Sequence, residues 1–227
     1  MGHRSIAILI ACLLAAPLLA GLTIAGDASA DTMTAWMSGT VHEEISAGEF
    51  VLQEMDDGGY LHVVYYDENE GAIGYATNAG GAWTHEVVPN TENAGDRASL
   101  ALDSEGNAHI SFFDSEGRLK YANNIGSWIV TTVINADVEW SAIVMDGEDQ
   151  AHIVYVDEDE DAVMYVNKLT SGWSEPVEID TSFDGFSGLV ATIGDDDVIH
   201  IAYMDIFERE LVYAYGHGDE WNDEVIE

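Results

Sequence analysis

Cysteine, proline and basic residues are scarce in this chain of 227 residues. Cys12 is the only cysteine and lies in an apolar N-terminal segment, so the rest of the chain cannot form a disulfide, a thiolate nucleophile or a cysteine-ligated metal site. There are three prolines, and no proline-rich linker divides the chain. The fold must therefore be held by its apolar core alone, which a domain of about 200 residues can supply.

Positive charge is the second shortage. Only 6 Lys and Arg stand against 43 Asp and Glu, and the formal net charge is −37. Such a surface repels phosphate backbones and anionic lipid, which excludes nucleic acid and electrostatic membrane binding. The chain also repels itself unless salt screens it, because the Debye length falls from about 8 Å at physiological salt to about 3 Å at 1 M. The even spread of the acids favours halophilic adaptation, and dedicated divalent-cation binding is the alternative.

The N-terminal segment has the pattern of an export signal. Arg4 precedes an apolar run over residues 6–25, and the small residues Ala28-Ser29-Ala30 follow it. Residues 1–30 are therefore expected to be a signal peptide, and the protein is expected to be secreted or at the cell surface. Twenty helical residues would also span a bilayer, so an uncleaved N-terminal anchor is the alternative.

The rest of the chain repeats one pattern four times. A segment that begins with His and ends with Asp recurs at intervals of 47, 43 and 48 residues, as His62–Asp67, His109–Asp114, His152–Asp157 and His200–Asp205. Each is followed by a tyrosine and, seven or eight residues later, by a tryptophan: Tyr75 and Trp83, Tyr121 and Trp128, Tyr165 and Trp173, Tyr213 and Trp221. A period of this length with several short strands per unit is typical of a β-propeller.

Each repeat is expected to form a four-stranded blade, over residues 50–97, 98–140, 141–187 and 188–227. The first strands are expected at Phe50–Met55, Ser99–Leu102, Ser141–Met145 and Gly188–Ile193, followed by turns rich in Asp and Gly. The His-containing second strand is apolar on both alternating faces, as a strand buried between two neighbouring blades must be. The predicted fold is an all-β propeller.

The number of blades in the ring stays open. Residues 31–49 form an N-terminal segment in which Trp36 begins a spare strand of the fourth type, and residues 50–227 already contain four complete repeats. This arrangement fits a four-bladed ring. It also fits part of a ring of five to eight blades, completed by another copy or by further sequence. The spare strand could also drive self-association through its edge.

The repeats resemble those of secreted microbial β-propellers of the broad sialidase-like (BNR, or Asp-box-like) group. The resemblance covers residues 36–227 and is clearest at Asp103–Ile110, Leu119–Ala122 and Trp128. The Asp-box pattern S-x-D-x-G-x-x-W is not met, because His stands in the place of its Trp. The resemblance implies an arginine triad in an active sialidase, but the arginines after the signal are only Arg97, Arg118 and Arg209, and none lies in such a motif. The expected protein is therefore not a catalyst of this type.

Three sets of residues are site candidates. The repeated histidines and tryptophans are expected to be structural, with the histidines bonding turns (His62, His109, His152, His200; Trp83, Trp128, Trp173, Trp221). The aspartates that end the second strands are either turn caps or ligands of Ca²⁺ at one rim: Asp67, Asp114, Asp157 and Asp205. Aromatic residues that do not repeat are the ligand-binding candidates: Phe183, Phe186, Phe207 and Tyr215.

The function expected from these features is a non-catalytic binding module. Its partner would be an extracellular carbohydrate or protein, bound where loops converge at one face of the ring. Ca²⁺ is the one cofactor that the acidic rim suggests. The alternatives are a degenerate glycosidase or lyase, and a structural repeat of a cell-surface assembly.

Overall fold

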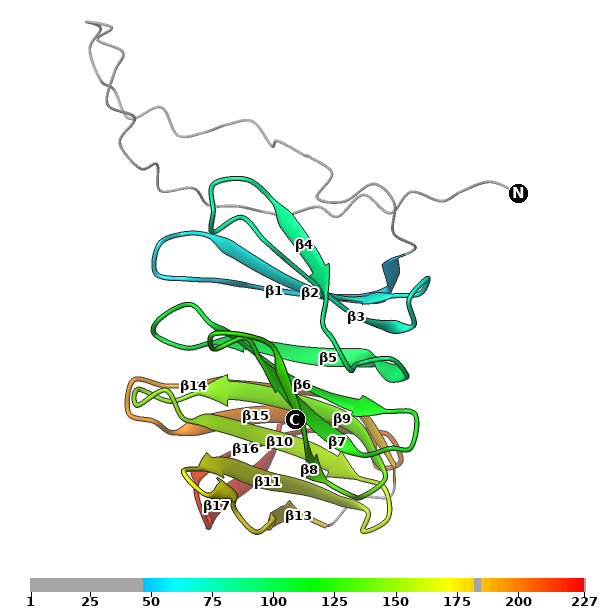
Figure 1. Ribbon diagram of the computed structural model, residues 1–227. Helices are drawn as coiled ribbons and strands as arrows, with labels where there is room; N and C mark the ends of the chain where they lie inside the picture. Colours follow the sequence, from blue (N-terminus) through cyan, green and yellow to red (C-terminus); the bar gives the residue numbers. More distant parts are fainter. Residues whose placement is uncertain (1–46, 182–184, 227) are drawn as a thin grey trace, which may run out of the picture. The chain divides into compact units, whose positions relative to one another are not determined.

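The structure, a computed structural model, describes residues 47–181 and 185–226 (Figure 1). The predicted signal peptide at residues 1–30, the spare strand at Trp36 and the ligand candidate Phe183 lie outside these residues. Within the described part, no helix is long and apolar enough to cross a membrane.

Four antiparallel sheets follow one another along the chain, and we number them 1 to 4. Sheet 1 contains β1 (Ala47–Met55), β2 (Leu61–Asp67), β3 (Ala72–Thr77) and β4 (Thr84–Val87). Sheet 2 contains β5 (Ala94–Leu102), β6 (Ala108–Asp114), β7 (Leu119–Asn123) and β8 (Ile129–Ile134). Sheet 3 contains β9 (Val138–Met145), β10 (Ala151–Asp157), β11 (Ala162–Leu169), β12 (Gly172–Trp173) and β13 (Val177–Asp180). Sheet 4 contains β14 (Phe186–Ile193), β15 (Ile199–Asp205), β16 (Glu210–His217) and β17 (Glu220–Ile226).

The predicted all-β propeller with four recognisable blades is confirmed, with two local differences. The first strands begin three to five residues earlier than expected in sheets 1 to 3 and two residues earlier in sheet 4, and irregular register interrupts the pairing of each with its neighbour. A bulge shifts the alternation of side chains, so the sequence pattern breaks where the strand continues. In sheet 3 the outer position is divided between β12 and β13, because Pro176 between them lacks a ladder N–H.

Each sheet has two faces that are set by alternation along its second strand. We call the face that carries the repeated histidine the back face and the opposite one the front face. Three buried apolar clusters lie between consecutive sheets, and each joins the back face of one sheet to the front face of the next. Between sheets 3 and 4, for example, Val154 and Tyr165 meet Ile201 and Tyr203. Stacking therefore buries both faces of the interior sheets.

Tryptophan–tyrosine pairs tie each sheet to the one before it. The rings of Trp128, Trp173 and Trp221 lie 5.3, 5.1 and 5.3 Å from those of Tyr75, Tyr121 and Tyr165, centroid to centroid. Such a pair adds about 0.5–1.5 kcal/mol to the stabilisation that comes from burial alone. The recurrent aromatics of the sequence thus connect the sheets of the core.

The repeated histidine links a tyrosine to a turn in the first three sheets. Its Nδ1 lies 2.5–2.6 Å from a tyrosine hydroxyl on the third strand, and its Nε2 lies 3.1–3.3 Å from a carboxylate in the preceding turn. The three groups are His62 with Tyr75 and Asp56, His109 with Tyr121 and Asp103, and His152 with Tyr165 and Asp146. Burial raises the pKa of each tyrosine to about 12, so its hydroxyl donates to Nδ1 and the Nε2–H donates to the carboxylate. In His109 and His152, whose pKa is lowered by burial, the imidazole is thereby held in its neutral form.

This neutral state makes folding stability depend on pH. Burial lowers the pKa of His109 and His152 below 6.5, and the attraction of Asp103 and Asp146 opposes that shift only in part. The unfolded chain then binds more protons than the folded one below about pH 6.5. We expect the free energy of unfolding to fall between pH 7.5 and pH 5.5, measured by chemical denaturation in 2 M NaCl to screen the net charge. A pH slope unchanged in the His109→Gln, His152→Gln double variant would contradict this assignment.

Candidate functional site

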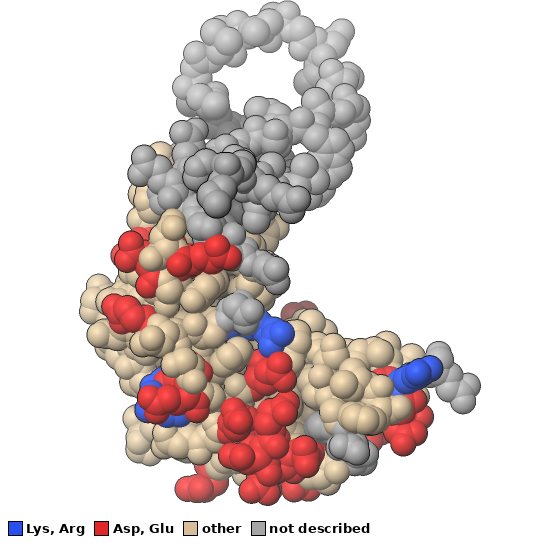
Figure 2. Space-filling model, turned by 90° about the vertical axis from the view of Figure 1, so that its right-hand side faces the viewer, with Lys and Arg blue, Asp and Glu red and all other residues tan. Residues whose placement is uncertain are grey.

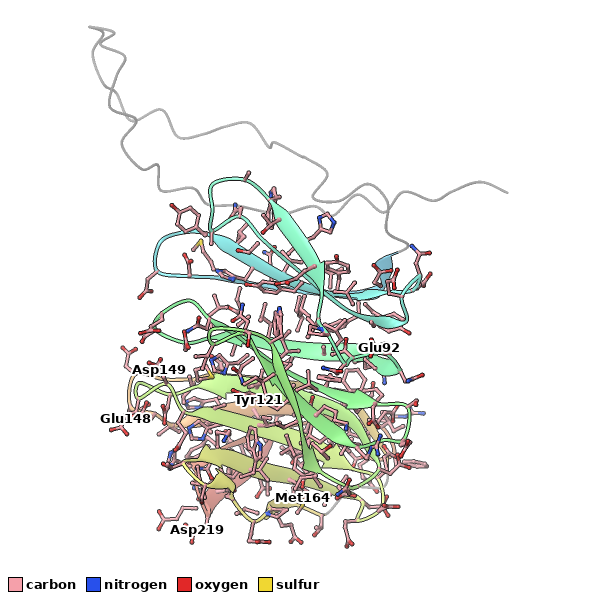
Figure 3. All side chains as sticks on the ribbon, in the orientation of Figure 1. Glu92, Tyr121, Glu148, Asp149, Met164 and Asp219 are labelled. Carbon is pink, nitrogen blue, oxygen red and sulfur yellow. The ribbon has the colours of Figure 1, made fainter. Side chains whose placement is uncertain are left out.

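A pocket of about 460 Å³ lies between sheets 2 and 3. The end of β8 and the following loop form one wall, with Asn135 and Ala136. Strands β10, β11 and β13 of sheet 3 form the other, with the side chain of Met164 on β11 (Figure 3). Asp159 and Glu160, in the turn from β10 to β11, also line the pocket. The pocket is therefore at the C-terminal end of β10, and the turn with Glu148 and Asp149 is at the other end of that strand (Figure 3). Its volume is in the range of small-molecule sites, roughly 300–1,000 Å³.

Tyr155 is the distinctive residue of this pocket. Its side chain is fully buried, and its hydroxyl is the one buried side-chain polar atom of the described residues that has no hydrogen-bond partner. Burying a hydroxyl without a partner costs about 1–3 kcal/mol. Because Tyr155 also lines the pocket, a ligand oxygen placed there could accept the missing hydrogen bond.

The tyrosine at the same repeat position in sheet 4 is satisfied. Tyr203 donates its hydroxyl hydrogen to the Asp180 carboxylate at 2.5 Å. The two tyrosines therefore differ in chemistry although their sequence contexts are alike. The Tyr203 hydroxyl is satisfied within the fold, and the Tyr155 hydroxyl has no partner among the described residues.

The walls of the pocket are acidic. Asp157, Asp159, Glu160 and Glu178 line it, and its lining contains no Lys or Arg. Burial raises the pKa of Asp157, and the neighbouring charges of Asp159 and Glu160 raise it further against two backbone hydrogen bonds. A buried carboxylate with a raised pKa inside a pocket is a physical indication of a functional site. An anionic ligand would be repelled here, whereas hydroxyl or ammonium groups could donate to the carboxylates.

In sheet 2 the position equivalent to Met164 is occupied by a lysine. Lys120 on β7 faces Phe112 as Met164 faces Tyr155. The Lys120 ammonium lies 3.2 Å from the Asp114 carboxylate and 2.7 Å from the Thr132 hydroxyl. The apolar Met164 in place of a lysine leaves the acidic groups of sheet 3 without a neutralising cation.

The aspartates that end the second strands cap turns in their own sheets. Each accepts backbone N–H bonds from residues two to four positions later, at 2.8–3.4 Å: Asp67 from Asn69 and Glu70, Asp114 from Glu116 and Arg118, Asp157 from Asp159 and Glu160, Asp205 from Phe207 and Glu208. Across residues 47–181 and 185–226, no three His, Cys, Asp or Glu side chains are grouped so as to hold a metal ion. A Ca²⁺ site formed by these aspartates stays a prediction. Asp157 alone among them lines the pocket.

The predicted aromatic ligand site is divided by the fold. Phe186 packs in the core against Tyr203, with ring centroids 5.4 Å apart, and is not accessible to a ligand. Phe207 is exposed on the turn from β15 to β16. Tyr215 is exposed on the back face of sheet 4, where its ring stacks with Tyr213 and His200. None of the three lines the pocket, whose key residue, Tyr155, lies in a second strand that the sequence predicts to be buried on both faces.

Comparison with known proteins supports the fold. No protein-family model matches the sequence, and no curated protein is similar to it in sequence. Among solved structures, the chain is similar to AofleA from Arthrobotrys oligospora, with 17% identity, a TM-score of 0.60, and 78% of this chain and 56% of that one covered. A mutant of the Aleuria aurantia lectin AAL in complex with Fucα1-6GlcNAc gives 17% identity and a TM-score of 0.62, with 85% and 68% covered. NanB sialidase from Streptococcus pneumoniae gives 14% and 0.50, with 66% and 26% covered.

These similarities bear on the fold alone, because the identities are below 25%. The chain spans only about half of AofleA and about a quarter of the sialidase. The propeller architecture of the sialidase-like resemblance is therefore supported, and membership of the BNR group in particular stays a prediction.

Proposed function

We propose that this protein is a non-catalytic, extracellular binding module whose pocket between sheets 2 and 3 takes a neutral sugar residue of a glycan. The unpartnered hydroxyl of Tyr155 carries the proposal. A sugar presents both donors and acceptors on adjacent carbons, so one hydroxyl can accept from Tyr155 while its neighbours donate to the carboxylates of the pocket. The acidic lining repels carboxylated, sulfated and phosphorylated ligands. An ammonium group could donate to the carboxylates but cannot accept a hydrogen bond from Tyr155, whereas sugar hydroxyls can do both. The solved lectin complex with Fucα1-6GlcNAc supports the proposal by showing that a chain of similar fold accommodates a saccharide.

A glycan array probed in 2 M NaCl tests this function, with two tyrosine variants as a matched pair. Tyr155→Phe is expected to weaken binding at least tenfold and to leave folding stability unchanged or slightly higher, because it removes an unsatisfied buried hydroxyl. Tyr203→Phe is expected to bind normally and to lose about 1–2 kcal/mol of stability, because it breaks the bond to Asp180. Met164→Lys is expected to abolish binding by placing a cation where Lys120 stands in sheet 2.

The outcomes separate the site from the function. Binding that survives both Tyr155→Phe and Met164→Lys would move the site elsewhere. An array that stays blank for the unaltered protein, with and without Ca²⁺, would reject the glycan as the ligand.

A further inference from the structure

The three interfaces between sheets repeat one contact, and parts of its two halves are exposed at the ends of the series. Inner strands contact one another in the order β1, β5, β9 and β14. Each interface places the back face of one sheet on the front face of the next. The back face of sheet 4 has no following sheet among the described residues, and sheet 1 is the first described sheet.

The back face of sheet 4 is open where the equivalent faces are closed. Leu211 is 38% exposed, whereas the residues at its repeat position in sheets 1 to 3 are 2% exposed or less: Ile73, Leu119 and Val163. Met204 is 39% exposed, and its equivalent Val156 is 1% exposed. Residues at these positions form the interfaces between sheets within the chain, but on sheet 4 they are exposed.

The chemistry of this face is also that of an interface. Val190, Met204, Leu211 and Tyr215 are all exposed on it. The back-face positions of β14, β15 and β16 include no acid, and the acids of this face, Glu220 and Glu224, are on the outer strand β17. A terminal repeat that ends in water needs a polar outer face. Large exposed apolar patches instead mark sites of association.

Sheet 1 presents the complementary half at its inner strand. Val63 and Tyr65, at the positions of Ile201 and Tyr203, are already buried, so the exposed part of this front face is at β1, where Met55 is 57% exposed. The residues at the position of Met55 in the other sheets pack into the inter-sheet clusters: Leu102, Met145 and Ile193. Trp83 occupies the tryptophan position that in each later sheet reaches back to a tyrosine of the preceding one.

We infer that a second copy of this chain docks its β1 strand and Trp83 onto the back face of sheet 4, so that the series β1–β5–β9–β14 continues across two molecules. Trp83 of the second copy then packs against Tyr213, as Trp221 packs against Tyr165 within the chain. The contact joins two different surfaces, so it closes into a ring or extends into a longer assembly. This inference is independent of the sugar pocket, which lies between sheets 2 and 3.

Light scattering after gel filtration of the full-length protein in 2 M NaCl tests the contact, because salt screens the repulsion between two acidic molecules. A dimer or larger assembly is expected near 100 μM. Leu211→Asp and Met55→Asp, one on each surface, are each expected to weaken association at least a hundredfold. Ile125→Asp in the loop between β7 and β8 is the matched control and is expected to leave association unchanged, since Ile125 (54% exposed) is about as exposed as Met55 and more exposed than Leu211.

Mixing the two variants distinguishes the geometry. Leu211→Asp keeps an intact β1 surface and Met55→Asp keeps an intact sheet 4 surface, so together they are expected to form one-to-one dimers. Equal circular dichroism spectra and unfolding midpoints for all three variants show that the fold is intact. A monomeric unaltered protein overturns the inference. So does loss of association in Leu211→Asp alone, which would indicate pairing of two sheet 4 faces, or association that neither variant weakens.

Discussion

Reducing NaCl from 1 M to 10 mM is expected to destabilise the protein by about 5 kcal/mol or more, comparable with the whole stability of an ordinary domain of roughly 5–15 kcal/mol. The cause is repulsion among 43 acidic side chains that only 6 basic ones oppose. The Debye length grows from about 3 Å to about 30 Å over this change, so charges on neighbouring sheets begin to interact. On the side of the molecule in Figure 2, Asp and Glu form several groups among few Lys and Arg.

The Lys and Arg side chains of the described residues can offset little of this repulsion. Arg118 and Lys120 converge on Asp114, and Arg97 pairs with Glu139. Exposed pairs of this kind contribute about 0–1 kcal/mol each. Salt must therefore supply most of the screening that oppositely charged side chains provide in other proteins.

Thermal unfolding at a series of NaCl concentrations checks the salt prediction. A control series with CaCl₂ at millimolar levels and constant ionic strength separates screening from site binding. If screening alone acts, millimolar Ca²⁺ at constant ionic strength changes the thermal stability only slightly. Full recovery of stability at low millimolar Ca²⁺ would instead favour dedicated cation sites, with the capping aspartates as the first candidates.

The repeat made the fold predictable because each copy carries several independent constraints. The interval between His109 and His152 set the blade length, and alternation along the second strand showed that both faces are buried. Boundaries of the first strands were missed, since the register irregularities near Ala94 and Val138 break the alternation on which the prediction depends.

The pocket could not be found in the same way. Tyr155 and Tyr203 occupy one repeat position, and only the three-dimensional placement of Asp180 shows that one hydroxyl is satisfied and the other is not. The sequence did hold one signal. Met164 stands at the position that Lys120 has in sheet 2, so the turn carboxylate Asp157 lacks the cation that lies beside Asp114. Ligand candidates were sought only among aromatic residues that do not repeat, so a candidate site that includes Tyr155 was not considered.

The histidine that links turn and tyrosine should be among the most sensitive residues of the fold. His152→Ala is expected to lower the free energy of unfolding by about 4 kcal/mol, which in a chain of this size is roughly 10 °C in Tm. The imidazole is fully buried, and its removal leaves a cavity, an unpaired Tyr165 hydroxyl and an Asp146 carboxylate without its donor.

His200 provides the matched control for that change. It bonds Tyr213 at 2.6 Å, but Gly194 stands in the turn where the other three sheets have an aspartate, and the ring is only half-buried on the open back face. His200→Ala is therefore expected to cost about 1 kcal/mol, mainly one hydrogen bond. Urea unfolding of both variants in 2 M NaCl measures the difference. Equal losses would mean that the histidine stabilises its sheet through the tyrosine alone, and that the turn carboxylate contributes little.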